Sequence, residues 1–393
     1  MARDVLHLEV RSGGDAAHTG SHVLTLEARD DANWNHLLPE VISGRAEPGG
    51  QVEHQLPAEQ VGAFRFFAGT TLAGRSDPRA SAWLEAGAAA DGPELRASSY
   101  LAELLHRRGH LEAPECAFDD PRAFVHFATL PAMQACRAQF VAFAVDSLPS
   151  ESGSLRVLDV GCGDGGLLAE LLPALLAAGR WDEVSTITLL DPSPAMISTA
   201  KARLASAWPD ARVEGRVSRL EFVASTLQGH YDLVLGSLSL HHMPAEVKRR
   251  ALSALAPSIE HLLLLELDAD HDSPEVGSPR LAASVHQTYG WMLAQILGPA
   301  TPDEVARESA DQFVAPELVS LLTQPRGSRS EYHMRRERWL TLLSDAMGPE
   351  IRPLGTRTLL ATPHADLFAM HVGRLDPGDT GDRRPGSPFR HDL

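Results

Sequence analysis

The sequence is poor in cysteine, in long apolar runs and in positive charge. Its 3 cysteines, Cys116, Cys136 and Cys162, lack the spacing of a disulfide framework or of a metal site. No apolar run approaches the length of about 18 residues that a membrane span needs, and the run within residues 261–266 has only the length of a strand. Residues 1–7 turn polar too early for a signal peptide. We therefore expect a cytoplasmic protein with reduced thiols, no metal site and no membrane partner.

Acidic residues outnumber basic ones. The chain of 393 residues has 35 Lys and Arg against 52 Asp and Glu, a net charge of −17. Proteins that bind nucleic acid need a basic face, and the short basic run at residues 335–338 is explained as well by a solvated helix. The expected partner is a small molecule and not a nucleic acid, and a homodimer stays open.

A glycine-rich loop is the most informative feature that is present. An apolar strand at residues 157–160 runs into Gly161, Gly163 and Gly166, and apolar residues with helical spacing follow. Glycine allows a backbone to approach a nucleotide-like ligand closely, although the same spacing also fits dinucleotide-binding proteins. Asp159, at the end of the strand, would repel a pyrophosphate and hold a cationic ligand. The loop resembles the first motif of class I S-adenosylmethionine-dependent methyltransferases.

Strand and helix signals alternate from residue 156 onward, which predicts an α/β fold with a doubly wound sheet. The resemblance implies the Rossmann-like, seven-stranded methyltransferase sheet, closed by a final antiparallel pair. The strands are expected at residues 156–160, 186–190, 212–217, 231–235, 262–267, 351–360 and 367–372.

The rest of the chain is divided by composition and periodicity. Alternation at residues 5–10, 22–27 and 63–67 predicts a small, mostly β or α+β unit of unknown role over residues 1–90. Residues 93–150 have helical periodicity, and the resemblance implies a lid over the methyl donor. The methyltransferase domain is expected over residues 151–375, with a helical insertion at 270–348 that shapes the acceptor pocket. The polar tail, residues 376–393, is expected to be disordered.

The donor site is expected in the loops after the strands. Asp191 follows the second strand, where its carboxylate can accept hydrogen bonds from both ribose hydroxyls, although a turn or cap role is the alternative. Asp164 is equally compatible with helix capping and ligand contact. No acid follows the third strand, where the family holds the adenine, and Ser218 is the nearest substitute. The predicted donor-binding residues are Asp159, Gly161, Cys162, Gly163, Asp164, Asp191, Pro192, Ser218 and Ser237.

Two histidines follow the fourth strand. The loop with His241 and His242 resembles that of small-molecule methyltransferases, and the Asn/Asp-Pro-Pro-aromatic loop of enzymes that methylate nitrogens of nucleic acids and proteins is absent. A hydroxyl acceptor needs a base, and histidine, with a pKa of about 6.5, suits this task. We predict that His241 or His242 is catalytic and that the other is structural, with His271 in reserve.

The predicted function is methyl transfer from S-adenosylmethionine to an oxygen or nitrogen of a small molecule, leaving S-adenosylhomocysteine. The Ala-, Arg- and Gly-rich composition is typical of high-GC bacteria and favours a specialised, secondary metabolite as acceptor. Residues 266–272 and 331–339 more weakly resemble bacterial relatives of the plant GRAS proteins, so a non-catalytic GRAS-like regulatory protein that keeps the donor site is an alternative. An NAD-dependent oxidoreductase, or an enzyme that uses the donor only as an electrostatic aid in a rearrangement, also stays open.

Overall fold

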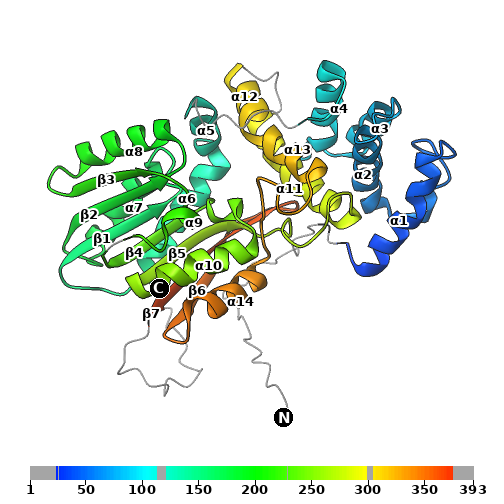
Figure 1. Ribbon diagram of the computed structural model, residues 1–393. Coiled ribbons are helices and arrows are strands. Elements are labelled where there is room, and N and C mark those ends of the chain that lie inside the picture. Colours follow the sequence, from blue (N-terminus) through cyan, green and yellow to red (C-terminus); the bar gives the residue numbers. More distant parts are fainter. Residues whose placement is uncertain (1–23, 25, 113–120, 228, 299–303, 375–393) are drawn as a thin grey trace, which may run out of the picture.

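The computed structural model describes residues 24, 26–112, 121–227, 229–298 and 304–374 (Figure 1). Its centre is a seven-stranded sheet in the order β3-β2-β1-β4-β5-β7-β6. Strands β1 to β5 are parallel, and β7 pairs antiparallel with both β5 and β6. This is the predicted Rossmann-like α/β sheet with its closing antiparallel pair. The strands are β1 Ser154–Val160, β2 Glu183–Asp191, β3 Arg212–Val217, β4 Tyr231–Ser237, β5 Ile259–Leu267, β6 Ile351–Ala361 and β7 Asp366–Arg374.

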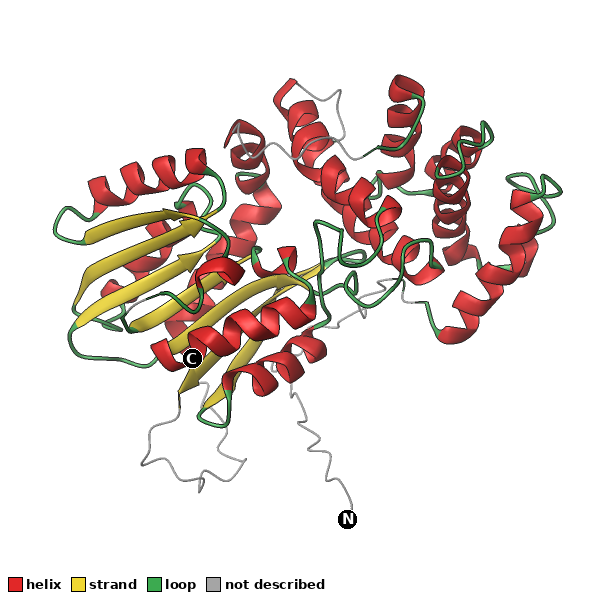
Figure 2. Ribbon diagram, viewed as in Figure 1, coloured by secondary structure: helices red, strands yellow, loops and turns green. Residues whose placement is uncertain are grey.

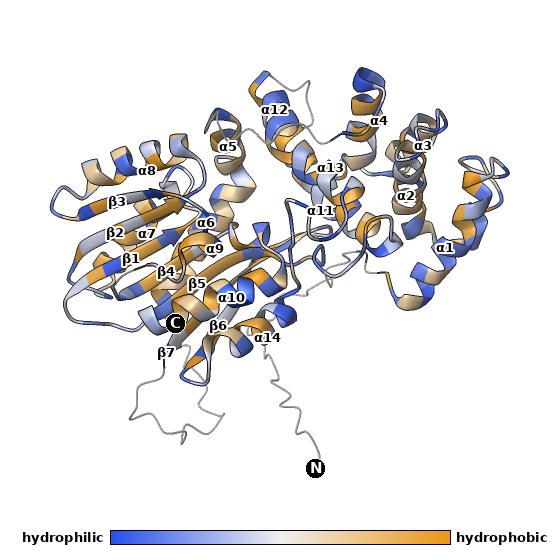
Figure 3. Cartoon of the chain, viewed as in Figure 1, coloured by the Kyte–Doolittle hydropathy of each residue, from blue (hydrophilic) through white to orange (hydrophobic). Residues whose placement is uncertain are grey.

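Helices cover both faces of the sheet because the central strands are apolar on both sides. In β1, Leu155 and Val157 belong to one apolar core, whereas Leu158 and Val160 belong to the other. Figure 3 shows the apolar strands between two helical layers. The first layer holds α6 Pro131–Ser147, α7 Gly166–Ala177 and α8 Pro194–Ala207, and the second holds α9 Leu220–Val223, α10 Ala245–Leu255 and α14 Arg336–Met347.

A second helical body lies beyond the carboxyl ends of the strands (Figure 2). Its N-terminal part packs around an aromatic core in which Trp34 and Trp83 each meet Phe64 edge-on. The body consists of α1 Ala28–Ile42, α2 Val61–Ala73, α3 Ala80–Ala90, α4 Ala97–Arg108, α5 Pro121–Ala128, α11 Pro279–Leu297, α12 Glu304–Ser309, the π-helical turn Ala310–Val314 and α13 Ala315–Thr323. Single 3-10 turns occur at Glu53–Gln55, Ala58–Gln60, Leu240–His242 and Ala256–Ser258.

The expectation of a mostly β N-terminal unit is wrong for the described residues. Residues 63–67 lie inside helix α2 and not in a strand. This helix is enclosed by neighbouring helices, so that Phe64, Phe66 and Phe67 are all buried. An enclosed helix is apolar on every side, and a five-residue window of it cannot be distinguished from a strand by periodicity. Residues 5–10 lie outside the described residues, as do Cys116 and the tail that was expected to be disordered.

The insertion between β5 and β6 returns to the sheet and brings polar residues to the ends of its strands. The segment 331–333 is fixed there by main-chain bonds, since Tyr332 N–H donates to the His241 carbonyl at 2.7 Å and His271 N–H to the His333 carbonyl at 2.9 Å. The buried Lys248 ammonium donates to the Tyr332 carbonyl at 2.5 Å. Residues distant in sequence therefore meet at one end of β4 and β5. Across the described residues, no helix has both the length and the apolar character needed to cross a bilayer.

Candidate functional site

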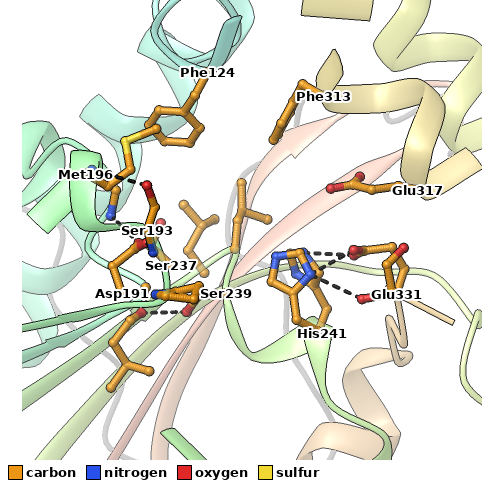
Figure 4. Close-up of a pocket in the computed structure, with 18 of the residues that line it drawn as sticks. Phe124, Asp191, Ser193, Met196, Ser237, Ser239, His241, Phe313, Glu317 and Glu331 are labelled. Carbon is orange, nitrogen blue, oxygen red and sulfur yellow. Dashed lines mark hydrogen bonds and ion pairs between the residues drawn. The ribbon is translucent and has the colours of Figure 1, made fainter. Parts of the chain in front are cut away.

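A cavity of about 440 Å³ lies where the carboxyl ends of β1, β2, β4 and β5 face the second helical body (Figure 4). Its size is within the range of about 300–1,000 Å³ that small-molecule sites have. The glycine loop and the end of β2 form one side, and histidines and glutamates form the opposite side. The predicted residues that line it are Gly161, Gly163, Asp191, Pro192, Ser218, Ser237, His241 and His242.

The glycine loop needs glycine for two reasons. Gly161, Gly163 and Gly165 have φ angles of +69°, +51° and +73°, a left-handed conformation that side chains disfavour. A Cβ on Gly161 would also lie 2.3 Å from the Cβ of Ser239. Ser239 in turn donates from its hydroxyl to the Val160 carbonyl at 2.6 Å. The loop is therefore pressed against the end of β4, and its backbone forms part of the cavity surface.

Asp191 links the loop to the end of β2. Its carboxylate accepts the Gly163 N–H at 3.1 Å and the Ser193 N–H at 2.8 Å, one on each oxygen. Burial raises the pKa of Asp191, and the two N–H groups oppose this by favouring the charged form. The side chain also lines the cavity, so that ribose-sized hydroxyls could reach its remaining lone pairs. The turn role and the ligand role, weighed as alternatives from sequence, are compatible here.

Three predicted donor residues lie outside the cavity surface: Asp159, Cys162 and Asp164. Asp159 is buried beneath the loop, where burial and the neighbouring Asp191 raise its pKa to about 8. Burial likewise raises the pKa of the Cys162 thiol. Asp164 accepts the Gly166 N–H at 3.0 Å and pairs with Arg203 at 2.9 Å, which is the capping role. These three residues lie beneath the loop, and their contact with the donor stays a prediction.

The adenine end of the predicted site is formed by the residues after β3. Ser218 lines the cavity and holds its N–H on the Asp191 carbonyl at 3.0 Å, and Arg219, Leu220 and Glu221 line it as well. These three were not predicted, because a sequence offers no sign of which residues after a strand turn inward.

The turn after β4 is conformationally strained. Leu238 has a φ of +47°, which costs a non-glycine residue roughly 1–2 kcal/mol. It lines the cavity together with Ser237 and Ser239, and its N–H is held by the Leu265 carbonyl at 2.8 Å. The strained residue lies where the chain turns from β4 into the 3-10 turn Leu240–His242. This turn positions the side chains of both histidines.

The two histidines belong to a cluster that we call the histidine–glutamate cluster: His241, His242, Glu266, Glu331 and His333. The His241 ring is hydrogen-bonded through Nδ1 to Glu266 Oε2 at 3.0 Å, and its Nε2 lies 3.1 Å from Glu331 Oε2. It stacks on His333, with ring centroids 4.0 Å apart. The His242 Nδ1 atom faces the Ser330 carbonyl at 3.2 Å and Glu331 Oε1 at 2.7 Å. Burial alone would lower the pKa of His242, but Glu331 outweighs it and raises the pKa to about 9.

Glu266, Glu331 and His333 were not predicted from the sequence. Glu331 and His333 lie in the insertion, where residues 331–339 were noted only for a family likeness, and Glu266 ends β5. Glu317, from α13, also lines the cavity and accepts the Tyr289 hydroxyl at 3.2 Å. Burial and the nearby Glu331 raise the pKa of Glu317 well above its usual range. The reserve candidate His271 is buried outside the cavity surface, and burial lowers its pKa to about 3.

Aromatic side chains cover the cavity between its two ends. Phe124 of α5 and Phe313 of the π-helical turn meet edge-on at 6.1 Å, and Phe127 lies 5.0 Å from Phe313 (Figure 4). A π-helical turn shifts the side chains that follow it, and such turns are frequent at functional sites. The predicted lid segment and the insertion thus both contribute to this cover, which also includes Trp291 of α11.

Comparison with known proteins agrees with this geometry. Residues 158–260 match a family model described as a methyltransferase domain. The chain is 30% identical over 171 residues to highly reducing polyketide synthase 2 of Gibberella zeae, covering 40% of this chain and 6% of that protein. It is 35% identical over 130 residues to a ubiquinone biosynthesis O-methyltransferase of Xanthomonas campestris pv. campestris, covering 33% of this chain and 48% of the relative. The chain thus spans about half or less of the curated relatives that it matches.

One solved structure resembles the chain over most of its length. The crystal structure of SCL7 in Oryza sativa has a TM-score of 0.58 at 16% identity, covering 81% of this chain and 99% of that one. At this identity the likeness concerns the fold alone, and it includes helices outside the sheet. With the strand order, the glycine loop and the family match together, residues 158–260 are a methyltransferase domain of the class I, S-adenosylmethionine-dependent type.

Proposed function

We propose that this protein transfers a methyl group from S-adenosylmethionine to an oxygen or nitrogen of a small molecule. The observation that carries the proposal is a single cavity with two chemically different ends. The glycine loop and Asp191 form one end, and His241 and Glu331 form the other. A donor held at the first end and an acceptor at the second would share one space, closed from above by aromatic rings.

The donor end fits S-adenosylmethionine in three respects. Gly161 and Gly163 leave room where a Cβ would collide with Ser239 or Phe124. Asp191 offers lone pairs to ribose hydroxyls. The glycine loop itself contains no Lys or Arg that could hold a phosphate. When bound, the donor supplies a methyl group made electrophilic by its sulfonium. The chain's task is then to position the two reactants, and orientation alone can supply about 7–11 kcal/mol.

The acceptor end supports a small molecule with an apolar body and one polar reacting group. Phe124, Phe313 and Trp291 offer the apolar contacts, and the histidine–glutamate cluster offers the polar ones. His241 is the residue through which the cluster acts on the acceptor. Glu266 accepts the hydrogen bond from His241 Nδ1, so that Nε2 is the ring nitrogen that faces Glu331 and the cavity. His242, paired with Glu331, orients this carboxylate.

The name of one curated relative, a ubiquinone biosynthesis O-methyltransferase, favours an oxygen acceptor. We propose a phenol-like or enol-like hydroxyl of a specialised metabolite as the first class of acceptor to test. A cytoplasmic location, the absence of a nucleic-acid partner and a homodimer belong to the same proposal.

The test is production of S-adenosylhomocysteine when the purified protein, the donor and panels of phenols, enols, amines and carboxylic acids are incubated together. We expect turnover with a hydroxyl-bearing acceptor. His241→Ala should lower it by about 100-fold or more while donor affinity stays within threefold of wild type. His230→Ala, an exposed histidine paired with Glu260, is the control. Full turnover in His241→Ala would refute the assigned role of the acceptor end.

A further inference from the structure

Donor binding at the glycine loop does not explain why the histidine–glutamate cluster contains buried charged groups. Four of its members, His241, His242, Glu331 and His333, line the cavity. Figure 4 labels His241 and Glu331 among them. Within the described residues, ligand atoms of His241, His242 and Glu331 all lie within 4.8 Å of one another. Imidazole nitrogens and a carboxylate are the ligands that zinc and related divalent transition metals take in open, reactive sites.

Glu331 is the least satisfied member of the cluster. Its side chain is fully buried, yet neither carboxylate oxygen accepts a hydrogen bond of acceptable angle. A buried carboxylate is costly unless N–H donors or positive charge lie beside it. The atoms that approach Glu331 are ring nitrogens of His241, His242 and His333. The cluster therefore gathers three imidazoles around one buried carboxylate, which is the composition of a transition-metal site.

The separations between these atoms lie within about 0.3 Å of those that a shared cation produces. His241 Nε2 lies 3.1 Å from Glu331 Oε2, His242 Nδ1 lies 2.7 Å from Oε1, and His333 Nε2 lies 3.6 Å from Oε2. Ligands bound about 2.1 Å from one metal ion are about 3.0–3.4 Å apart in octahedral or tetrahedral geometry. Small movements of these side chains would bring all of them to bonding distance of one point.

Glu266 supplies the orienting contact that metal-binding histidines usually have. It accepts the hydrogen bond from His241 Nδ1 at 3.0 Å and is itself held by the Leu240 N–H at 3.2 Å. A carboxylate behind a histidine fixes the ring and leaves the other nitrogen as the ligand. The alternative grouping of His241, Glu266 and His333 uses this already engaged Nδ1 atom, and Glu266 does not line the cavity. The Glu331 side is therefore the open one.

We propose that His241, His242 and Glu331, with His333 as a fourth ligand, bind one divalent transition-metal cation at the acceptor end of the cavity. The mixed nitrogen and oxygen set suits Zn²⁺, Fe²⁺ or Co²⁺ and disfavours Mg²⁺, which prefers oxygen ligands. His242 Nδ1 exchanges its proton for the cation, as metal binding to histidine requires. This metal site was not expected from the sequence because its ligands come from two distant segments, residues 241–242 and 331–333.

The cation would face the acceptor. A hydroxyl bound to it loses its proton to water at a lower pH than a free hydroxyl does, which prepares the oxygen for methylation. This role rests on the proposed function, whereas the binding of the cation does not. A failure of cation binding can therefore be distinguished from a failure of the proposed methyl transfer.

The test is titration of untagged, chelator-stripped full-length protein with Zn²⁺ and Co²⁺, by calorimetry and by the visible absorption of bound Co²⁺. We expect one cation per chain. His241→Ala and Glu331→Gln should each weaken affinity by about 100-fold or more, and Glu266→Gln by about 10- to 100-fold. His230→Ala, which removes an exposed histidine, should bind as wild type does. Unchanged binding of S-adenosylhomocysteine by each variant shows that it is folded.

Two results would overturn the site: no stoichiometric Zn²⁺ or Co²⁺ binding by the wild-type protein, or full affinity in Glu331→Gln. A second measurement does not depend on variants. Anomalous diffraction from wild-type crystals soaked in Zn²⁺ should give a peak between His241 and Glu331, and a peak only elsewhere contradicts the proposal. Metal binding without methyl transfer would refute the proposed function alone, and full turnover by metal-free protein would refute the cation's role in the reaction but not its binding.

Discussion

Replacing Asp191 by Asn should weaken S-adenosylhomocysteine binding by about 10- to 150-fold. The carboxylate holds the Gly163 N–H at 3.1 Å and the Ser193 N–H at 2.8 Å, one on each oxygen, and faces the cavity. An amide keeps the shape but has one oxygen, so its NH₂ group must face one of these N–H donors. It also loses the charge that strengthens hydrogen bonds to ribose hydroxyls. A lost hydrogen bond to a charged group costs about 1.5–3 kcal/mol, and each 1.4 kcal/mol is a factor of about ten in affinity.

Calorimetric titration with S-adenosylhomocysteine measures this effect, and two other variants calibrate it. Asp182→Asn removes the same charge just before β2, at its other end, where the carboxylate accepts the Gly153 N–H at 2.8 Å. Asp159→Asn changes a carboxyl beneath the loop whose pKa of about 8 keeps it mostly protonated at neutral pH. We expect changes within threefold in both. If folded Asp191→Asn also stays within threefold of wild type, Asp191 is only a turn residue and the donor site is placed wrongly.

Three further predictions test other parts of the account. Gly161→Ala should weaken donor binding by more than tenfold, because its Cβ would lie 2.3 Å from that of Ser239. Gly179→Ala is the control and should not weaken binding, because Gly179 has the same left-handed backbone but no neighbour within 4 Å of such a Cβ. Burial, with His261 alongside, lowers the pKa of His371 to about 3, so only the unfolded state takes up this proton as pH falls below about 6.5. His371 should therefore contribute a loss of about 1.6 kcal/mol in the free energy of unfolding from pH 6.5 to 5, and the loss measured by urea unfolding should be smaller by about that amount in His371→Gln; an equal loss in the variant contradicts this. Hydrogen exchange should slow on addition of S-adenosylhomocysteine in residues 121–128 and 310–314 as well as in the glycine loop, and a response confined to the loop would exclude the lid.

The strands were predictable because their signal is local. β1 and β5 are continuous apolar runs bounded by turn residues, as strands buried on both faces must be. Helix α8 has an equally local signal, since Ser193 caps it by accepting the Met196 N–H at 3.3 Å and Pro194 begins it. Helix α2 failed for the opposite reason, because burial on all sides removes the period that identifies a helix.

The donor and acceptor ends of the site differed in predictability. Asp191 and the glycines follow strand ends, a place where parallel sheets bind ligands, so sequence position was enough. The partners of His241 were not predictable, because Glu331 reaches it only after the insertion folds back onto β4 and β5. The position of a residue along a strand also did not reveal whether its side chain reaches the cavity. Asp159 is buried below the cavity surface, whereas Asp191 lines it.

The measurement that tests the central claim most directly is a crystal structure of the protein with S-adenosylhomocysteine. The account predicts the ribose hydroxyls within hydrogen-bond distance of Asp191, the adenine beside Ser218 and Leu220, and the sulfur directed toward His241 and Glu331. A ligand bound with its ribose away from Asp191, or with its sulfur directed away from the histidine–glutamate cluster, would contradict the assignment of one cavity to donor and acceptor.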